Sequence, residues 1–182
     1  RAAAFVVPSL VLAVTCLPPS LGGLFGVPPE DEGLRSIFNG KDLTGWDGDP
    51  RLWSVKDGAI RGETTPESPA KGNTFLIWKG GEVEDFVLRF EYKLSNPGNS
   101  GVQYRSFPIG PKEQPWRVGG YQADFEAGSR FSGILYGERY RGILGDRGQK
   151  TKIGKNHKPT VVGSVGDRKG LQKFIKKGDW NH

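Results

Sequence analysis

The feature that most constrains this chain is a two-residue alternation of apolar and polar side chains over residues 99–105 and 120–126. Successive side chains of an extended strand point to opposite faces, so this period predicts two half-buried β-strands. The apolar face takes Val102, Tyr104, Tyr121, Ala123 and Phe125, and the polar face takes Gln103, Arg105, Gln122, Asp124 and Glu126. A row of amide, carboxylate and guanidinium groups is typical of a wall that binds a polar ligand. Sugars are the natural candidates, because hydroxyls both donate and accept hydrogen bonds.

Composition favours many short strands over helices. The chain has 182 residues, enough for one domain with a real core plus a leader. Its 28 glycines and 13 prolines argue against long helices, and its 20 aromatic residues suit strands and turns. Together with the polarised alternation, this predicts an all-β antiparallel sandwich that binds its ligand on a concave face or at the loop rim.

Several further segments have strand or turn signals. Asp57-Gly58 between residues 53–55 and 59–61 predicts a two-residue hairpin. Residues 75–78 and 134–136 read as short strands, and residues 86–94 as the clearest one, with Phe86, Leu88, Phe90, Tyr92 and Leu94 on its buried face. Residues 96–99 predict a turn into the strand that follows.

The last third of the chain has a different character. Residues 137–166 are glycine-rich, basic and irregular, which predicts a long functional loop. Residues 167–177 are expected to form one short helix capped by Asp167, with Leu171, Phe174 and Ile175 facing inward.

Charge is distributed unevenly along the chain. Residues 1–126 carry a net charge of −3 and residues 127–182 a net charge of +9. A solvated basic flank is the favoured interpretation. The alternative is an anionic partner, such as an acidic polysaccharide or nucleic acid. No nucleic-acid-binding motif accompanies the charge, so nucleic acid is not expected as a partner.

Cysteine and histidine are too scarce for the commonest metal and disulfide frameworks. Cys16 is the single cysteine, and His157 and His182 are the two histidines. These numbers exclude a Cys/His zinc site and an internal disulfide. The cofactor and any metal stay unknown, with room left for a divalent cation held by carboxylates and carbonyls.

The N-terminus predicts export. Arg1 precedes an apolar run that ends at Leu17, too short to span a bilayer and suited to a signal-peptide core. An ordinary buried strand is the alternative. We therefore expect a signal peptide over residues 1–22, a Pro/Gly-rich acidic linker over 23–35 and one domain over 36–182. The mature chain would have no membrane span and a periplasmic or extracellular location.

The domain resembles a known family. Phe38-Asn39-Gly40-Lys41-Asp42-Leu43-Thr44-Gly45-Trp46 is similar to the opening signature of the 3-keto-disaccharide hydrolase domain, formerly a domain of unknown function. Five further similar segments follow in order, at residues 53–60, 85–92, 99–105, 120–124 and 132–137. Six weak motifs in the right order are specific together, and the resemblance covers residues 36–182. The leader and the glycine-rich insert resemble those of exported planctomycete-type proteins.

The resemblance implies a fold and an activity. The fold would be a concanavalin A-like jelly-roll sandwich, and the relatives continue past residue 181 with further strands, so this chain is expected to lack the last C-terminal strands. The activity would be hydrolysis of glycosidic bonds in 3-keto-glycosides or related disaccharides, by elimination and hydration with a carboxylate base. The alternative is a non-catalytic carbohydrate-binding module on the same sandwich.

The site residues follow from both arguments. The catalytic candidates are Asp124 and Glu126 as carboxylates and Arg105 as cationic stabiliser. The substrate-binding candidates are Asn99, Gln103, Tyr104, Gln122, Tyr136 and, for stacking, Trp116. A plainer interpretation stands beside each: Arg105 and Asp124 as a cross-strand ion pair, and Asn99 as a turn former. The two carboxylates could also be the acid and base of an ordinary glycosidase.

Overall fold

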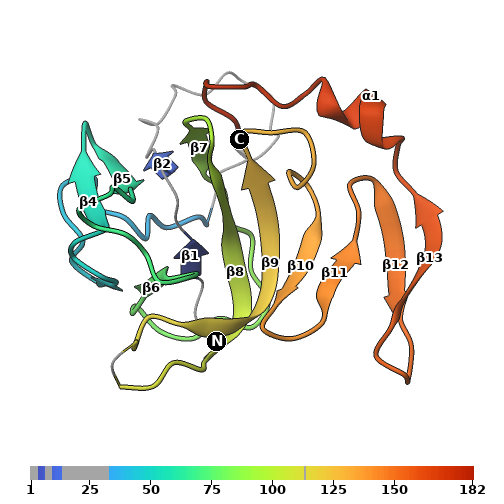
Figure 1. The fold of residues 1–182 in the computed structure, drawn as a ribbon, viewed down its shortest axis with the longest axis horizontal. Helices are drawn as coiled ribbons and strands as arrows, with labels where there is room; N and C mark the ends of the chain where they lie inside the picture. Colours follow the sequence, from blue (N-terminus) through green and yellow to red (C-terminus); the bar gives the residue numbers. More distant parts are fainter. Residues whose placement is uncertain (1–3, 7–9, 14–32, 113) are drawn as a thin grey trace.

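The protein is an all-β sandwich with one short helix in the part of the chain that the structure describes (Figure 1). The structure is a computed structural model and describes residues 4–6, 10–13, 33–112 and 114–182. Its elements are β1 (Ala4–Val6), β2 (Leu10–Ala13), β3 (Trp46–Asp47), β4 (Trp53–Lys56), β5 (Ala59–Gly62), β6 (Phe75–Trp78), β7 (Glu91–Leu94), β8 (Asn99–Pro108), β9 (Val118–Glu126), β10 (Leu135–Glu138), β11 (Gly142–Gly145), β12 (Gln149–Ile153), β13 (Pro159–Ser164) and α1 (Arg168–Gln172).

The strands form two larger sheets and one ribbon. The seven-stranded sheet has the order β11-β10-β9-β8-β1-β6-β3, and the four-stranded sheet has the order β4-β5-β2-β7. Strands β12 and β13 pair with each other and lie beyond β11 at one end of the molecule (Figure 1). Every strand pair is antiparallel, as the sequence predicts for a sandwich.

The core lies between the two larger sheets. Its buried side chains come from both sheets and from the loops that flank them: Phe38, Trp46, Leu52, Trp53, Ile60, Leu76, Trp78, Leu94, Val102 and Phe125. Tyr92 stacks on Phe125 with ring centroids 4.2 Å apart, which ties β7 to β9 across the sandwich. The sequence correctly assigned Val102 and Phe125 to the apolar face.

The hairpin between β4 and β5 is confirmed. Lys56 pairs with Ala59, which leaves Asp57 and Gly58 as the two-residue turn. Both turn residues have positive φ, 52° and 75°, as the turn type favoured by an Asp-Gly pair requires. The strand predicted over residues 75–78 is likewise present, as β6.

The strand predicted over residues 86–94 is too long. Pairing with β2 covers Glu91–Leu94, so β7 contains only the second half of the alternating segment. In the first half, Phe86 is 42% exposed, contrary to its predicted burial, although Phe90 still packs against the core. Alternation alone cannot say where a partner strand ends, and β7 lies at the edge of its sheet.

The prediction of a long loop over residues 137–166 is wrong. This segment contains β11, β12 and β13, whose glycines lie at turns and strand ends. The helix that follows is capped by Asp167 as predicted, because the Asp167 side chain accepts a hydrogen bond from the Gly170 amide. It is shorter than predicted, and Phe174 is 70% exposed where an inward position was expected.

The predicted signal peptide over residues 1–22 and most of the linker over 23–35 lie outside the described residues, apart from β1, β2 and residues 33–35. Strand β1 pairs with β6 and β8, and β2 pairs with β5 and β7. A strand interpretation of this segment predicts such pairings, whereas a leader interpretation does not. Cleavage and export stay predictions.

A β-bulge in β8 gives the fold a testable weak point. The register between β8 and β9 shifts between Tyr104 and Phe107, and Arg105 has a φ of 48°. Opposite the bulge, Gly120 has a φ of 144°, and a Cβ there would lie 3.0 Å from the Ser106 Cα. Only glycine therefore fits this close approach of the two backbones.

We expect Gly120→Ala to lower the free energy of unfolding by about 1–3 kcal/mol. The added Cβ would be crowded against the β8 backbone, and alanine is strained at the positive φ of this position. Urea denaturation measures the effect. Gly40→Ala is the matched control: Gly40 also has positive φ, 75°, but nothing lies within 4 Å of an added Cβ. Equal losses in the two variants would contradict the close approach.

Candidate active site

The polar row predicted from the alternation lies on one face of β8, β9 and β10. Gln103 pairs with Gln122 across β8 and β9, and Gln122 pairs with Tyr136 across β9 and β10. Directly paired residues project to the same face of a sheet. Val102 and Phe125 alternate with these residues and lie in the core, so the polar row faces away from the core.

Asp124 lies in the same row, opposite Gly101. The glycine is required there, because a Cβ would approach the Ala123 carbonyl oxygen and the Gln122 side chain to 2.7 Å. The side-chain amide of Gln122 donates a hydrogen bond to Asp124 Oδ1. This contact fixes the direction of the carboxylate within the row.

The amides of the row are buried without their full set of partners. Gln103 is fully buried and Gln122 is 3% exposed. Among the described residues, both side-chain polar atoms of Gln103 and the Oε1 atom of Gln122 have no hydrogen-bond partner. Each such group costs about 1–3 kcal/mol, so a cluster of them indicates a place where a bound polar group completes the hydrogen bonding.

The carboxyl of Asp124 is electrostatically perturbed. Burial raises the pKa of Asp124 from 3.8 to about 6. The hydrogen bond from Gln122 opposes this shift, and the nearby carboxylates of Glu138 and Glu126 add to it. A carboxylate whose pKa approaches neutrality is a stronger base than a solvated one and is typical of a functional site.

Glu126 and Asn99 also lie on this face, as a pair at the end of the β8–β9 ladder. Glu126 Oε1 accepts hydrogen bonds from the backbone amides of Arg130 and Phe131, at 2.5 and 2.8 Å. The Glu126 amide in turn donates to the Ser132 hydroxyl. Glu126 therefore shapes the turn between β9 and β10, which is a structural task rather than a catalytic one.

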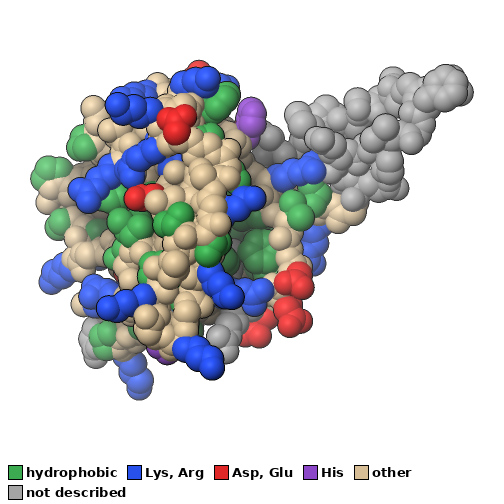
Figure 2. All heavy atoms as spheres, turned by 90° about the vertical axis from the view of Figure 1, so that its right-hand side faces the viewer, with side chains coloured by type: hydrophobic (Ala, Val, Ile, Leu, Met, Phe, Trp, Pro, Cys, Tyr) green, Lys and Arg blue, Asp and Glu red, His purple; other side chains and the backbone are tan. Residues whose placement is uncertain are grey.

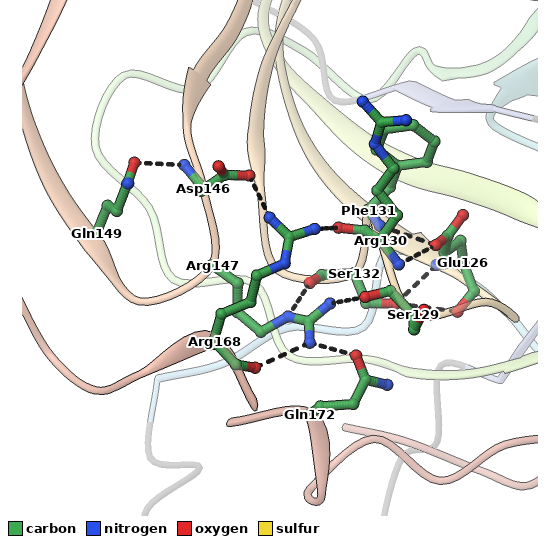
Figure 3. Close-up of polar contacts among 10 residues, drawn as sticks. All are labelled: Glu126, Ser129, Arg130, Phe131, Ser132, Asp146, Arg147, Gln149, Arg168 and Gln172. Atoms are coloured by element: carbon green, nitrogen blue, oxygen red, sulfur yellow. Dashed lines mark hydrogen bonds and ion pairs between the residues drawn. The ribbon is translucent and has the colours of Figure 1, made fainter. Parts of the chain in front are cut away.

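A buried arginine holds the same turn from the other side (Figure 3). Arg147 is 6% exposed, and its guanidinium donates to the carbonyl oxygens of Ser132 and Ser129 at 2.6 and 3.0 Å. It also donates to the Arg168 carbonyl and to the Gln172 side chain, both in α1. Burial lowers the pKa of Arg147. The turn after Glu126 is thus fastened to the C-terminal helix.

Three of the predicted site residues lie elsewhere. The side chain of Arg105 is 55% exposed at the bulge, and its guanidinium lies 3.5 Å from Asp85. Strand spacing puts Arg105 about 13 Å along the sheet from Asp124. Tyr104 belongs to the other face, where its ring contacts Tyr121.

Trp116 is also held away from the row. Its indole nitrogen donates to Asp47 in β3 at 2.7 Å, and its backbone carbonyl accepts from Phe75 in β6. The alternation rule failed for Arg105 because a bulge adds a residue to one strand and ends the simple period of two.

The structure adds a residue that the sequence did not single out. Glu138 pairs with Gly120, so its side chain lies on the face that carries Gln122 and Tyr136. It is 4% exposed, and Asn73 donates to its Oε2 atom at 2.9 Å. Glu138 and Asn73 line a cavity of about 380 Å³. Counting two residues on from Tyr136 would have found this position, but the expected strand ended at Tyr136.

Among the described residues, no group of three or more His, Cys, Asp or Glu side chains is arranged to hold a metal ion. The carboxylate-held cation that the sequence left open therefore has no candidate site in this part of the chain. The same described residues include no helix long and apolar enough to cross a membrane.

An all-β sandwich with a perturbed carboxylate beside buried amides on one sheet face has the features of a polar-ligand site, but such a fold alone does not fix a function. Comparison with known proteins is more specific. The chain belongs to the 3-keto-alpha-glucoside-1,2-lyase-like domain family, whose sequence model matches residues 33–182. This confirms the family resemblance seen in the sequence.

One curated relative is a 3-keto-disaccharide hydrolase from Bacteroides thetaiotaomicron, 30% identical over 95 residues. The match covers 48% of this chain and 32% of the relative, so the chain spans about a third of that protein's length. No solved structure matches the chain.

The raised pKa of Asp124 predicts a pH-dependent stability. The folded state favours the protonated carboxyl, so this contribution is fully present below about pH 4 and is lost as the pH rises through 6. We expect the free energy of unfolding of the wild-type chain to fall between pH 4 and 6 relative to that of Asp124→Asn. Urea denaturation from pH 3 to 8 measures the difference.

Asp42 provides a control of opposite sign. Hydrogen bonds from Thr44 and Asn39 lower the pKa of Asp42 to about 2. The contribution of Asp42 is therefore lost as the pH falls below about 4, and Asp42→Asn should leave the pH 4–6 window unchanged. A flat difference between wild type and Asp124→Asn across that window would contradict the assignment.

Proposed function

We propose that the protein cleaves the glycosidic bond of 3-keto-glycosides by elimination, with Asp124 as the general base. The observation that supports this most strongly is the buried Asp124 carboxyl, with a pKa of about 6, beside two buried amides that lack partners. The family description names a 1,2-lyase, and the curated relative is named a hydrolase of 3-keto-disaccharides. Both names fit one chemistry, because elimination followed by hydration amounts to hydrolysis.

The carbonyl at C3 makes the chemistry accessible to a carboxylate. It acidifies the proton on C2, which passes to Asp124 while the electron pair forms an enolate across C2 and C3. The enolate then expels the oxygen substituent of C1, leaving a C1–C2 double bond and restoring the C3 carbonyl. Addition of water across that double bond gives the hydrolysed sugar. A base whose pKa lies near the working pH suits the first step.

The two remaining tasks fall to neighbours of Asp124. We assign to the buried Nε2 of Gln103, which has no hydrogen-bond partner among the described residues, the donation of a hydrogen bond to the developing enolate oxygen, the role first expected of Arg105. Tyr136 pairs with Gln122 and lines the cavity, so its phenol is placed to protonate the leaving oxygen. Each group acts from a strand, which limits its movement.

A non-catalytic carbohydrate-binding module is the second candidate, and one observation favours it. Four aromatic rings form a continuous cluster: Tyr104, Tyr121, Tyr140 and Phe107. Tyr140 and Phe107 are 50% and 38% exposed. Exposed aromatic rings are a common platform for sugars, but a binding module has no use for a base held near neutrality.

The basic C-terminal third supports a solvated flank. Lys150, Lys152, Lys155 and Lys158 are all exposed on or near the β12–β13 ribbon. Figure 2 shows basic side chains spread over this end of the molecule, separated by other residues rather than gathered in one cluster. This arrangement favours solubility over a dedicated anionic partner.

The decisive variant is Asp124→Asn, which keeps the shape of the side chain and removes the base. We expect turnover of a 3-keto-glycoside to fall by about a hundredfold or more, without a loss of melting temperature at pH 7, where a neutral amide avoids the cost of the buried charge. In the wild type, kcat/KM should rise with pH through an apparent pKa near 6, because the base must be deprotonated. Release of the aglycone, with and without a chelator, measures both.

Arg105→Lys is the matched control. The Arg105 side chain is largely solvent-exposed and faces the exposed Asp85, so we expect turnover within about threefold of wild type. Wild-type turnover in Asp124→Asn would rule out Asp124 as the base. A hundredfold loss in Arg105→Lys would return Arg105 to the site.

A further inference from the structure

A cavity of about 380 Å³ opens beside the polar row. Its lining residues are Gly72, Asn73, Tyr136, Gly137, Glu138, Arg139, Tyr140 and Gly142. The volume lies at the small end of ligand pockets, which span about 300–1,000 Å³. Glu138 pairs with Gly120, which puts it about 13 Å along the sheet from Asp124, and Tyr136, which also lines the cavity, lies between them on the same face.

The cavity contains a carboxylate with unused acceptor capacity. Glu138 Oε2 accepts one hydrogen bond from Asn73, and Oε1 lies 3.5 Å from the guanidinium of Arg139. An ionised carboxylate offers about four acceptor positions on its two oxygens. The remaining positions suit a ligand that presents two neighbouring donors.

A second unsatisfied group lies on the same face. Ser106 lies in the bulge opposite Gly120, the partner of Glu138, and a Cβ on Gly120 would lie 3.0 Å from the Ser106 Cα. Ser106 is 8% exposed, and its buried hydroxyl has no hydrogen-bond partner among the described residues. Burial of such a group is costly unless a ligand or water completes its hydrogen bonding.

Tyr140, another lining residue of the cavity, has an aromatic ring that is held in place. The ring makes edge contacts with Phe107 and Tyr121, and the guanidinium of Arg141 lies 4.1 Å from its centroid. These contacts limit the movement of a ring that is still half exposed. An aromatic residue and a hydroxyl-accepting carboxylate in the lining of one cavity suit the apolar face and polar rim of a pyranose.

We propose that this cavity binds the unoxidised pyranose ring of a disaccharide substrate, with Glu138 accepting hydrogen bonds from two vicinal hydroxyls. The inference rests on the proposed function and adds the substrate class to it. The choice between the two rings follows from their chemistry. A 3-keto ring has lost its C3 hydroxyl and with it both vicinal diols that include C3, whereas an unoxidised ring retains them. Glu138 therefore selects the ring that leaves, and Asp124 acts on the ring that carries the ketone.

The test compares two substrates with the same 3-keto ring. One is a 3-keto-disaccharide, and the other is a 3-keto-glycoside with a methyl aglycone. We expect Glu138→Gln to lower kcat/KM for the disaccharide by about 10- to 100-fold, mainly through KM, while kcat/KM for the methyl glycoside stays within threefold. Equal losses on both substrates, or no loss on either, would overturn the proposal.

Asn73→Ala is a second variant that probes the same carboxylate if Glu138→Gln does not fold. Asn73 is exposed and contacts Glu138 from a loop. It should shift disaccharide KM in the same direction by a smaller factor. Tyr140→Ala should also raise disaccharide KM, whereas Tyr140→Phe, which keeps the ring, should not. A Tyr140→Ala enzyme with wild-type disaccharide KM would remove Tyr140 from the subsite.

A binding measurement separates this proposal from the proposed function. Titration of the ¹⁵N-labelled chain with methyl α-glucopyranoside should shift the amide resonances of Gly137 and Gly142, and Glu138→Gln should abolish the shifts. If no 3-keto-glycoside is turned over but these shifts appear, the proposed reaction fails and the sugar subsite stands. If turnover is normal and the shifts are absent, the subsite fails and the reaction stands.

Discussion

The pairing of β8 with β9 is the constraint on which the rest of the molecule depends. These are the two longest strands, and their register sets Gln103 against Gln122 and Gly101 against Asp124. A slip of one residue would turn one strand over relative to the other, so that either Val102 or Phe125 would leave the core and the amide beside it would enter the core. The same register therefore determines the hydrophobic interior and the polar row, so neither can change without the other.

Much of the fold could be predicted, because local chemistry decides it. The Asp57-Gly58 turn, β6 and the alternation around Gln122 all follow from short stretches of sequence. The errors arise where residues far away in the sequence determine whether a segment forms a strand and where that strand ends. Phe86 continues a perfect alternation yet lies beyond the end of the ladder, and the glycines after Gly137 separate three strands rather than form a loop. Glycine content alone does not distinguish a loop from a series of tight turns.

In the candidate site, too, local sequence predicts some features and only the folded chain determines the others. Periodicity placed Gln103, Gln122 and Asp124 on one face, and the register agrees. It misplaced Arg105, because a bulge is invisible to a pattern of period two. It passed over Glu138, whose importance comes from a cavity that only the folded chain creates. The pKa of Asp124 likewise depends on burial and on neighbours from β10, and no sequence window contains both.

The arginine that fastens the β9–β10 turn gives the C-terminal helix an influence beyond its size. Arg147 joins α1 to the turn after Glu126 through neutral acceptors, while the charges of Glu126 and Asp146 act on its guanidinium from nearby. Loosening α1 would leave a buried cation with half of its hydrogen bonds, and the turn would have to open to hydrate it. The end of the chain and the border of the polar row are thus expected to open together as one cooperative unit, although Asp124 and α1 are more than forty residues apart in the sequence.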